Sequence, residues 1–169
     1  MNSGSASLQD ALRQSLSGSV QFDAEANRQL GASLWNADVA PDVLALVKCS
    51  STAAVQQAVR MASDHGAPIS TLGGGHDWTG RAAGRGGITL DFRQLNAVEL
   101  NRDRSAVTVG GGTLIDHVLA GIPDDLAIVT GTISTVGVTG LTLGGGYGKL
   151  NSRFGLALDT GRRTAAGRR

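Results

Sequence analysis

Residues 71–80 read TLGGGHDWTG, and the interpretation of the whole chain depends on this stretch. It begins with a short apolar segment and continues with three glycines, Gly73, Gly74 and Gly75. Glycine adopts positive φ and leaves its backbone N–H open to a ligand, so such a loop is typical of a diphosphate site. The same residues are also compatible with a simple tight turn, and one glycine loop does not separate the two interpretations.

His76 follows the glycines and stands beside Asp77 and Trp78, where we expect an exposed imidazole rather than a core residue. A neutral imidazole nitrogen is a competent nucleophile. A hydrogen-bonded loop histidine is the alternative that these residues leave open. His65 is expected to be structural, near a helix end, and His117 a surface or core residue. No carboxylate lies at ligand spacing from the three histidines, so no metal site is predicted.

The segment before the loop predicts a βαβ unit. The apolar run 43–47 suits a buried strand, and Ser51 and Gly66 are placed to begin and end a helix. A second strand follows at 68–72. The glycine loop would then lie at the carboxyl end of that strand.

The second half of the chain predicts an antiparallel or mixed sheet. Short β segments are expected at 88–92, 98–100 and 106–109, and a short helix at 113–119. Residues 130–160, TGTISTVGVTGLTLGGGYGKLNSRFGLALDT, show neither helix nor strand period for any length. We expect them to form a long cradle of irregular backbone, with a second glycine loop from Gly131 to Gly140. The fold class is therefore α+β.

The composition and the net charge of the chain limit the kinds of protein, partner and site that it could represent. Among 169 residues, 41% are hydrophobic and 17% charged, values typical of a globular domain, while the 25 glycines are unusually many. A net charge of +1 gives no support for nucleic acid or a membrane surface as partner. Cys49 is the single cysteine, which excludes an internal disulfide and a thiolate metal cage. The first twenty residues lack the pattern of a signal peptide, and the expected location is cytoplasmic.

Four separate stretches carry a resemblance to a known family. They are WN-x(4)-P-D-V at 35–43, GGGHDWTG around His76, GTISTVGVTG at 131–140 and LGGGYGKLNSRFGLALD at 143–159. In this order they resemble the FAD-binding PCMH-type domain of the vanillyl-alcohol oxidase superfamily, most closely its berberine bridge enzyme-like branch. The resemblance implies an α+β domain of two small α/β subdomains, with FAD as cofactor.

The resemblance also assigns roles to individual residues. In the family, the histidine of GGGH is joined through a ring nitrogen to the 8α-methyl group of the flavin, which implies His76 here. Gly73 to Asp77 resemble one wall of the pyrophosphate site. The other wall is implied at Gly131, Thr132, Thr135, Gly137, Val138 and Gly140. Tyr147 resembles an aromatic residue beside the flavin or substrate cavity, with a packing role as the alternative.

One departure from the family pattern bears on how the flavin is attached. Many relatives carry a cysteine in the second loop that bonds to flavin C6, and Ile133 stands at that position. A single attachment through His76 is the implication, and Cys49, far upstream at a strand end, is no substitute.

By resemblance, the protein is an FAD-dependent oxidoreductase whose flavin N5 accepts a hydride from a small organic substrate. Residues 1–30 are expected to be a lead-in, with a helix carrying Leu8, Leu12 and Leu16, and 31–159 an incomplete FAD-binding domain. Residues 160–169 are expected to be a basic disordered tail, and the C-terminal part and substrate domain to be missing. Two alternatives stay open, a noncatalytic flavin-binding half-enzyme that needs a partner chain and an inactive truncated product.

Overall fold

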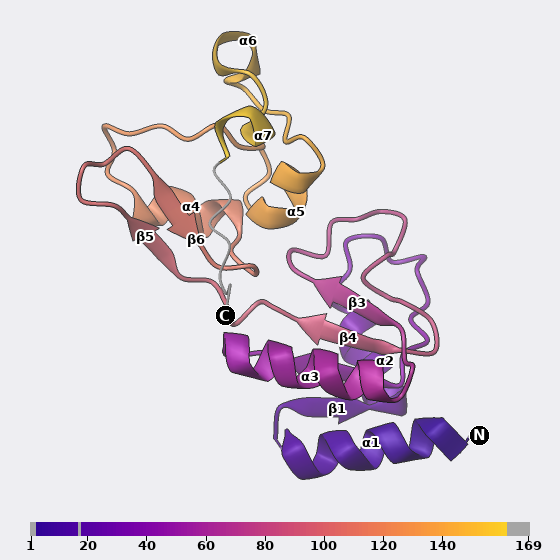
Figure 1. Ribbon diagram of the computed structural model, residues 1–169. Coiled ribbons are helices and arrows are strands. Elements are labelled where there is room, and N and C mark those ends of the chain that lie inside the picture. The colour runs from indigo at the N-terminus through magenta and orange to yellow at the C-terminus, as the bar shows by residue number, and fades with distance from the viewer. Residues whose placement is uncertain (1–2, 17, 162–169) are drawn as a thin grey trace. The chain divides into compact units, whose positions relative to one another are not determined.

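The computed structural model describes residues 3–16 and 18–161, which fall into two units, 1–95 and 96–169 (Figure 1). The first unit contains α1 (Ser3–Ser15), β1 (Val20–Phe22), α2 (Asp23–Gly31), β2 (Ala45–Lys48), α3 (Thr52–Asp64), β3 (Ile69–Leu72) and β4 (Ile88–Asp91). The second contains β5 (Val98–Leu100), β6 (Val107–Val109), α4 (Ile115–Gly121), α5 (Val138–Leu143), α6 (Asn151–Phe154) and α7 (Ala157–Thr160). The predicted α+β class and its two subdomains are confirmed.

The first unit is built on a four-stranded sheet in the order β1-β2-β4-β3. The β2, β4 and β3 strands are parallel, and β1 joins the edge of β2 antiparallel. The predicted βαβ unit is confirmed, but its two strands are not neighbours, because β4 lies between them. The assignment of 88–92 to a sheet of the second half is therefore wrong. All four β4 residues are buried, as expected for a central parallel strand.

Helices cover both faces of this sheet (Figure 1). Side chains alternate along each strand, so Ala45 and Val47 face α1 and α3, whereas Leu46 faces α2. Leu8 and Leu12 of α1 are fully buried against the first face. The segment expected to be a lead-in, residues 1–30, thus contains α1, β1 and nearly all of α2, which supply a helix to each face and a strand to the sheet edge.

The ends of α3 are as predicted. Ser51 Oγ accepts a hydrogen bond from Ala54 N at 3.2 Å, and Gly66 has a φ of +60° just past the last turn. His65 caps this end: its Nδ1 donates to Met61 O at 2.8 Å. The structural role predicted for His65 is confirmed.

Replacing Ser51 with alanine should lower the free energy of unfolding by about 1 kcal/mol, because it removes the acceptor for one free N–H of the first helical turn. Urea denaturation followed by circular dichroism measures this. Ser63→Ala, an exposed change in the last turn of the same helix, is the control and should leave stability unchanged or slightly higher. Equal effects of the two substitutions would contradict the capping role.

The second unit is a β5–β6 antiparallel hairpin with α4 packed on it. Its core gathers around Ile115, Val118 and Val138, with valines of both strands against them. The hairpin turn places Arg104 at a φ of +60°, and its Nη2 pairs with Asp125 at 2.5 Å. The helix that the sequence predicted from Thr113 begins at Ile115, since the Thr113 side chain is buried and donates to Ala97 O at 3.3 Å.

Residues 130–160 differ from the irregular cradle that was predicted, because three short helices lie within them. Because these helices are only four to six residues long, the sequence shows no helical periodicity for them. Glycines at positive φ separate them, at Gly145, Gly146 and Gly155. Of the predicted tail, Thr160 ends α7 and Gly161 follows it, and the remaining eight residues lie outside the described part of the chain.

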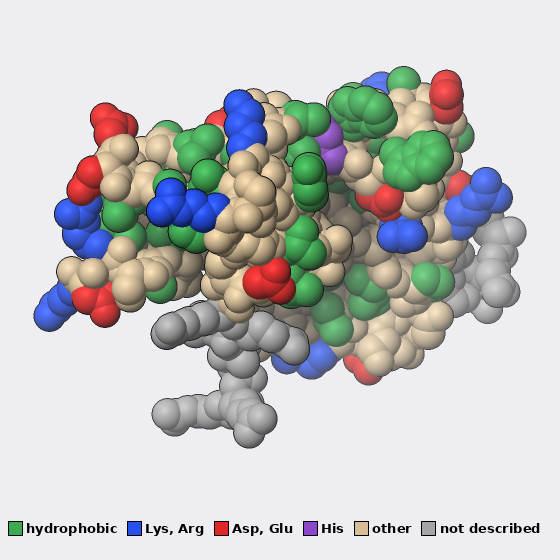
Figure 2. Space-filling view, turned by 90° about the horizontal axis from the view of Figure 1, so that it is seen from above, with side chains coloured by type: hydrophobic (Ala, Val, Ile, Leu, Met, Phe, Trp, Pro, Cys, Tyr) green, Lys and Arg blue, Asp and Glu red, His purple; other side chains and the backbone are tan. Residues whose placement is uncertain are grey.

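Within the described ranges, no helix is long and apolar enough to span a membrane, and no group of three metal-ligating side chains occurs. Figure 2 shows basic and acidic side chains interspersed over the visible face rather than gathered by sign. This distribution agrees with the balanced charge of the sequence.

Candidate functional site

The first glycine loop leaves the carboxyl end of β3. Leu72, the last β3 residue, pairs with Asp91 of β4, which also pairs with Lys48 of β2, so three parallel strands end at this edge. Phe92 N donates to Leu72 O at 2.9 Å and ties the two strand ends together where the loop begins. Open sheets with parallel strands bind ligands beyond these carboxyl ends. The fold therefore positions Gly73 to Asp77 at the edge where a ligand is expected.

The requirement for glycine at position 75 comes from a close contact within the unit. Gly75 has a φ of +72°, and a Cβ there would lie 2.1 Å from Ser33 O. Gly75 O accepts a hydrogen bond from Trp35 N at 3.0 Å. The segment after α2 therefore lies directly on the glycine loop, and only glycine permits that approach.

His76 is half-buried, not exposed as predicted, and its ring lies beside that of Trp35. The two rings stack with centroids 6.2 Å apart and an interplanar angle of 23°. Asn36 Nδ2 donates to Trp78 O at 2.8 Å and adds a second link between the same segments. Sequence reasoning did not place Trp35 at the site, although the WN motif was one of the stretches that carried the family resemblance.

Asp77 shapes the loop through its carboxylate. It accepts hydrogen bonds from Thr79 Oγ1 at 2.8 Å, Thr79 N at 3.2 Å and Arg81 N at 2.9 Å. Partial burial opposes ionisation, but these hydrogen bonds outweigh it, so the pKa of Asp77 lies below its usual range. The side chain is thus an anion occupied by its own loop, which leaves the backbone as the part of Asp77 suited to a diphosphate.

The second predicted loop belongs to the second unit and is anchored to the start of α4. Ile115 N donates to Val136 O at 3.0 Å, and Val138 N donates to Thr113 O at 2.9 Å. Gly137 forms an isolated antiparallel bridge with Leu114 and has a φ of −70°, so positive φ is not the reason for glycine there. The anchored backbone holds the loop in place.

The side chains of this loop divide into two groups. Thr132 and Thr135 are exposed, and a Cβ added at Gly140 would meet open space. Val138 is buried in the core of the unit, and a Cβ at Gly131 would lie 3.2 Å from Leu141 Cδ1. The two threonine side chains therefore lie at the surface of the unit, whereas Val138 could contact a ligand only through its backbone.

A second close approach in this unit was not found from the sequence. A Cβ at Gly148 would lie 1.8 Å from Thr130 O, and Gly148 N donates to Asn151 Oδ1. Next to this contact, Thr130 Oγ1 and Asn151 Nδ2 are buried without a hydrogen-bond partner among the described residues. The many glycines of this segment did not indicate that the side chains of Thr130 and Asn151 would be buried without a partner.

Three further side chains singled out from the sequence differ in exposure. Tyr147 is 80% exposed and Ile133 is 55% exposed, so neither belongs to the core. Cys49 is buried, and its burial together with the nearby charge of Asp91 raises its pKa to about 11. It is a protonated thiol at neutral pH and a poor nucleophile.

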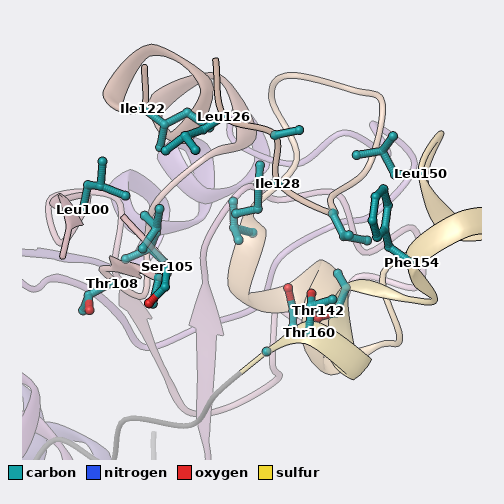
Figure 3. Close-up of a pocket in the computed structure, with 18 of the residues that line it drawn as sticks. Leu100, Ser105, Thr108, Ile122, Leu126, Ile128, Thr142, Leu150, Phe154 and Thr160 are labelled. Carbon is teal, nitrogen blue, oxygen red and sulfur yellow. Dashed lines mark hydrogen bonds between the residues drawn. The ribbon is translucent and has the colours of Figure 1, made fainter. Parts of the chain in front are cut away.

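The second unit also contains a largely apolar cavity of about 570 Å³ (Figure 3). Its walls come from the hairpin, the segment after α4 and the short helices, and its labelled apolar residues include Leu100, Ile122, Leu126, Leu150 and Phe154. Its polar lining residues are Arg104, Ser105, Thr108, Thr139, Thr142 and Thr160. A mainly apolar lining with a few polar groups is typical of a site for a small organic group.

Comparison with known proteins matches a single family over most of the chain. The family model of the FAD binding domain matches residues 43–163. The (R)-6-hydroxynicotine oxidase of Paenarthrobacter nicotinovorans is 35% identical over 146 residues, which are 86% of this chain and 32% of that protein.

Solved structures agree with this match. BBE-like 1 of Physcomitrella patens has a TM-score of 0.80 at 26% identity, over 90% of this chain and 34% of the other. Glucooligosaccharide oxidase from Acremonium strictum, whose FAD is described as 6-S-cysteinyl, 8α-N1-histidyl, has a TM-score of 0.76 at 30% identity, over 94% of this chain and 33% of the other. The chain spans about a third of the length of these relatives.

The described residues can be tested for their fit to FAD. Buried polar atoms are normally paired, so Thr130 Oγ1 and Asn151 Nδ2 are places where a polar ligand or water would be bound. Both can donate, as a ligand rich in oxygen and nitrogen acceptors requires. His76 adds a ring nitrogen at the rim of the first unit, half-buried and oriented by Trp35. Each unit, taken by itself, therefore offers donors of the kind that FAD accepts.

Proposed function

Because this chain belongs to the FAD-binding domain family of the FAD-linked oxidoreductases, in its berberine bridge enzyme-like branch, with FAD as its cofactor, we propose that it binds FAD covalently through His76. We further propose that the flavin accepts a hydride from a small organic substrate. The observation that carries the proposal is the place of His76 on a glycine loop at the carboxyl edge of a parallel sheet, its ring against Trp35.

The glycine loop would hold His76 in place for the proposed attachment. Close contact of Gly75 with Ser33 fixes the backbone on one side of His76, and Asp77 fixes it on the other through Thr79 and Arg81. Stacking on Trp35 restricts rotation of the imidazole, so a ring nitrogen is presented in a narrow range of directions. Holding a nucleophile in this way lowers the entropy lost when it reacts.

In the proposed step, a neutral imidazole nitrogen of His76 forms a bond to the 8α-carbon of FAD. The imidazole nitrogen would lose its proton as the bond forms, and bound FAD together with an electron acceptor such as dioxygen would supply the loss of one proton from the 8α-carbon and the two-electron oxidation that the bond requires. Bound FAD supplies the redox chemistry, and the protein supplies binding and orientation. Ile133, at the position where relatives can carry cysteine, leaves His76 as the proposed point of attachment.

The second loop is proposed, from the family resemblance, to contact the pyrophosphate of FAD. Thr132 and Thr135 of this loop are exposed, and the unpaired donor of Asn151 lies beside Gly148. The names of relatives support small organic substrates, since one acts as a hydroxynicotine oxidase and another as a chitooligosaccharide oxidase.

Mass spectrometry of the peptide containing His76 tests the attachment. After expression with FAD available, we expect the flavin mass on this peptide and not on the peptide containing Ile133, because Ile133 has no nucleophilic side chain. His76→Ala should abolish acid-stable flavin and keep the fold, since His76 is only half-buried. Flavin that remains acid-stable in His76→Ala, or none on the wild-type peptide, would overturn the proposal.

A further inference from the structure

An ion pair between a buried carboxylate and a partly exposed arginine lies close to the His76 loop. Asp91, the last residue of β4, has a side chain only 5% exposed, and Arg93 pairs with both of its oxygens. Arg93 Nε lies 2.9 Å from Oδ1 and Nη2 lies 2.6 Å from Oδ2. A buried carboxylate needs such a partner, and the two parallel hydrogen bonds fix the guanidinium plane.

The outer edge of that guanidinium holds the segment that follows α2. Arg93 Nη1 donates to Ser33 Oγ at 2.9 Å, and Ser33 Oγ donates to Gln29 O at 2.8 Å. Ser33 is therefore held from α2 and from the end of β4 at once. Its own carbonyl oxygen is the atom that closely approaches Gly75.

Ser33 in turn decides where Trp35 lies. The Trp35 side chain is 67% exposed, so core packing does not fix its position. Its backbone does, through the hydrogen bond from Trp35 N to Gly75 O and through the fixed Ser33 two residues earlier. The indole placed in this way is the surface on which the His76 imidazole stacks.

We propose that Arg93, held by Asp91, is a positioning residue for His76 and acts through Ser33 and Trp35. The proposal rests on the proposed function in one respect, because the orientation matters for the bond from His76 to FAD. The structural half of the proposal, that Arg93 sets the position of Trp35 against His76, concerns this chain alone and is tested without flavin. Arg93 donates hydrogen bonds to Asp91 and to Ser33 Oγ, and these are the contacts through which it would act on the His76 loop.

Nuclear magnetic resonance of the flavin-free full chain tests the structural half. The ring current of Trp35 should displace the His76 ring-proton resonances, which are identified by their absence in His76→Ala, and Trp35→Leu supplies the undisplaced value. We expect Arg93→Met and Ser33→Ala to move these resonances towards the Trp35→Leu value. Arg85→Met, at an exposed arginine of the same unit, should leave them unchanged.

Unchanged His76 resonances in a folded Arg93→Met protein would overturn the inference. If Arg93→Met does not fold, because Asp91 is left buried without its partner, Ser33→Ala decides the matter. It keeps the Asp91–Arg93 pair and removes only the link to Ser33.

The rate of flavin attachment tests the consequence. When flavin-free chain is mixed with FAD, Arg93→Met should attach flavin to the His76 peptide about tenfold more slowly than wild type, since misplacing a reacting group by 1 Å can cost about 100-fold. Arg93→Lys should recover part of the rate, and Arg85→Met all of it. An unchanged rate with displaced resonances would refute the role in attachment. A wild-type chain that takes up no flavin would refute the proposed function, while the resonances still decide whether Arg93 positions His76.

Discussion

Replacing Gly75 with alanine is expected to lower the free energy of unfolding by about 3 kcal/mol or more, because a left-handed backbone costs about 1–2 kcal/mol for alanine and overpacking adds about 1–3 kcal/mol. The new Cβ would lie 2.1 Å from Ser33 O, a backbone atom that cannot rotate away. Relief of this overlap requires the segment after α2 to leave the loop, and Trp35 would leave His76 with it. Urea denaturation of the flavin-free chain measures the loss.

Gly86→Ala is the matched control for this prediction. Gly86 has a φ of +67°, close to that of Gly75, but a Cβ there would meet nothing within 4 Å. It should therefore show only the backbone cost of about 1–2 kcal/mol. If Gly75→Ala and Gly86→Ala were equally destabilising, the contact with Ser33 would carry no weight, and the explanation given for Gly75 would be wrong.

Replacing Gly148 with alanine is expected to destabilise the second unit by about 2 kcal/mol or more, in the range measured when a core is overpacked. The added Cβ would lie 1.8 Å from Thr130 O, and no flexible side chain stands between the two to absorb the overlap. Because Thr130 directly precedes Gly131, the displacement would reach the second predicted loop. Thermal unfolding followed by circular dichroism measures the effect.

Gly140→Ala separates this steric effect from a general need for glycine in the second unit. Gly140 lies within α5, and a Cβ there would meet open space. Alanine is favoured over glycine in a helix by about 1 kcal/mol, so this variant should be as stable as wild type or more stable. A large loss of stability in Gly140→Ala would contradict the helical environment described here.

The sequence predicted individual helices and strands better than it predicted which of them pack together. The helix between Ser51 and Gly66 could be found because a capping serine and a terminating glycine act within one turn. The position of β4 could not, because an apolar run such as 88–92 fits any buried strand, and its partners are chosen by packing of distant segments. Short helices such as α6 and α7 escaped because four residues do not establish a period.

At the candidate site, too, local features could be predicted from the sequence and contacts between distant segments could not. The motif around His76 helped to indicate FAD as the cofactor, which the family match shows, while the role of His76 itself stays a prediction. The exposure of His76 was predicted wrongly, since nothing in TLGGGHDWTG reveals that Trp35 lies against it. The buried, unpaired Thr130 Oγ1 and Asn151 Nδ2 could not be predicted from the sequence either, because the burial of a polar side chain is a property of the folded unit.

The central place of β4 has a consequence for how the first unit is made. During synthesis, β1, β2 and β3 are all complete before residues 88–91 leave the ribosome, yet β2 and β3 pair with β4 and not with each other. Until then, both strands have open edges that favour association with other chains. Closing the sheet requires contacts between distant segments, which are slow to form. We therefore expect the nascent chain to depend on chaperones until the last strand inserts.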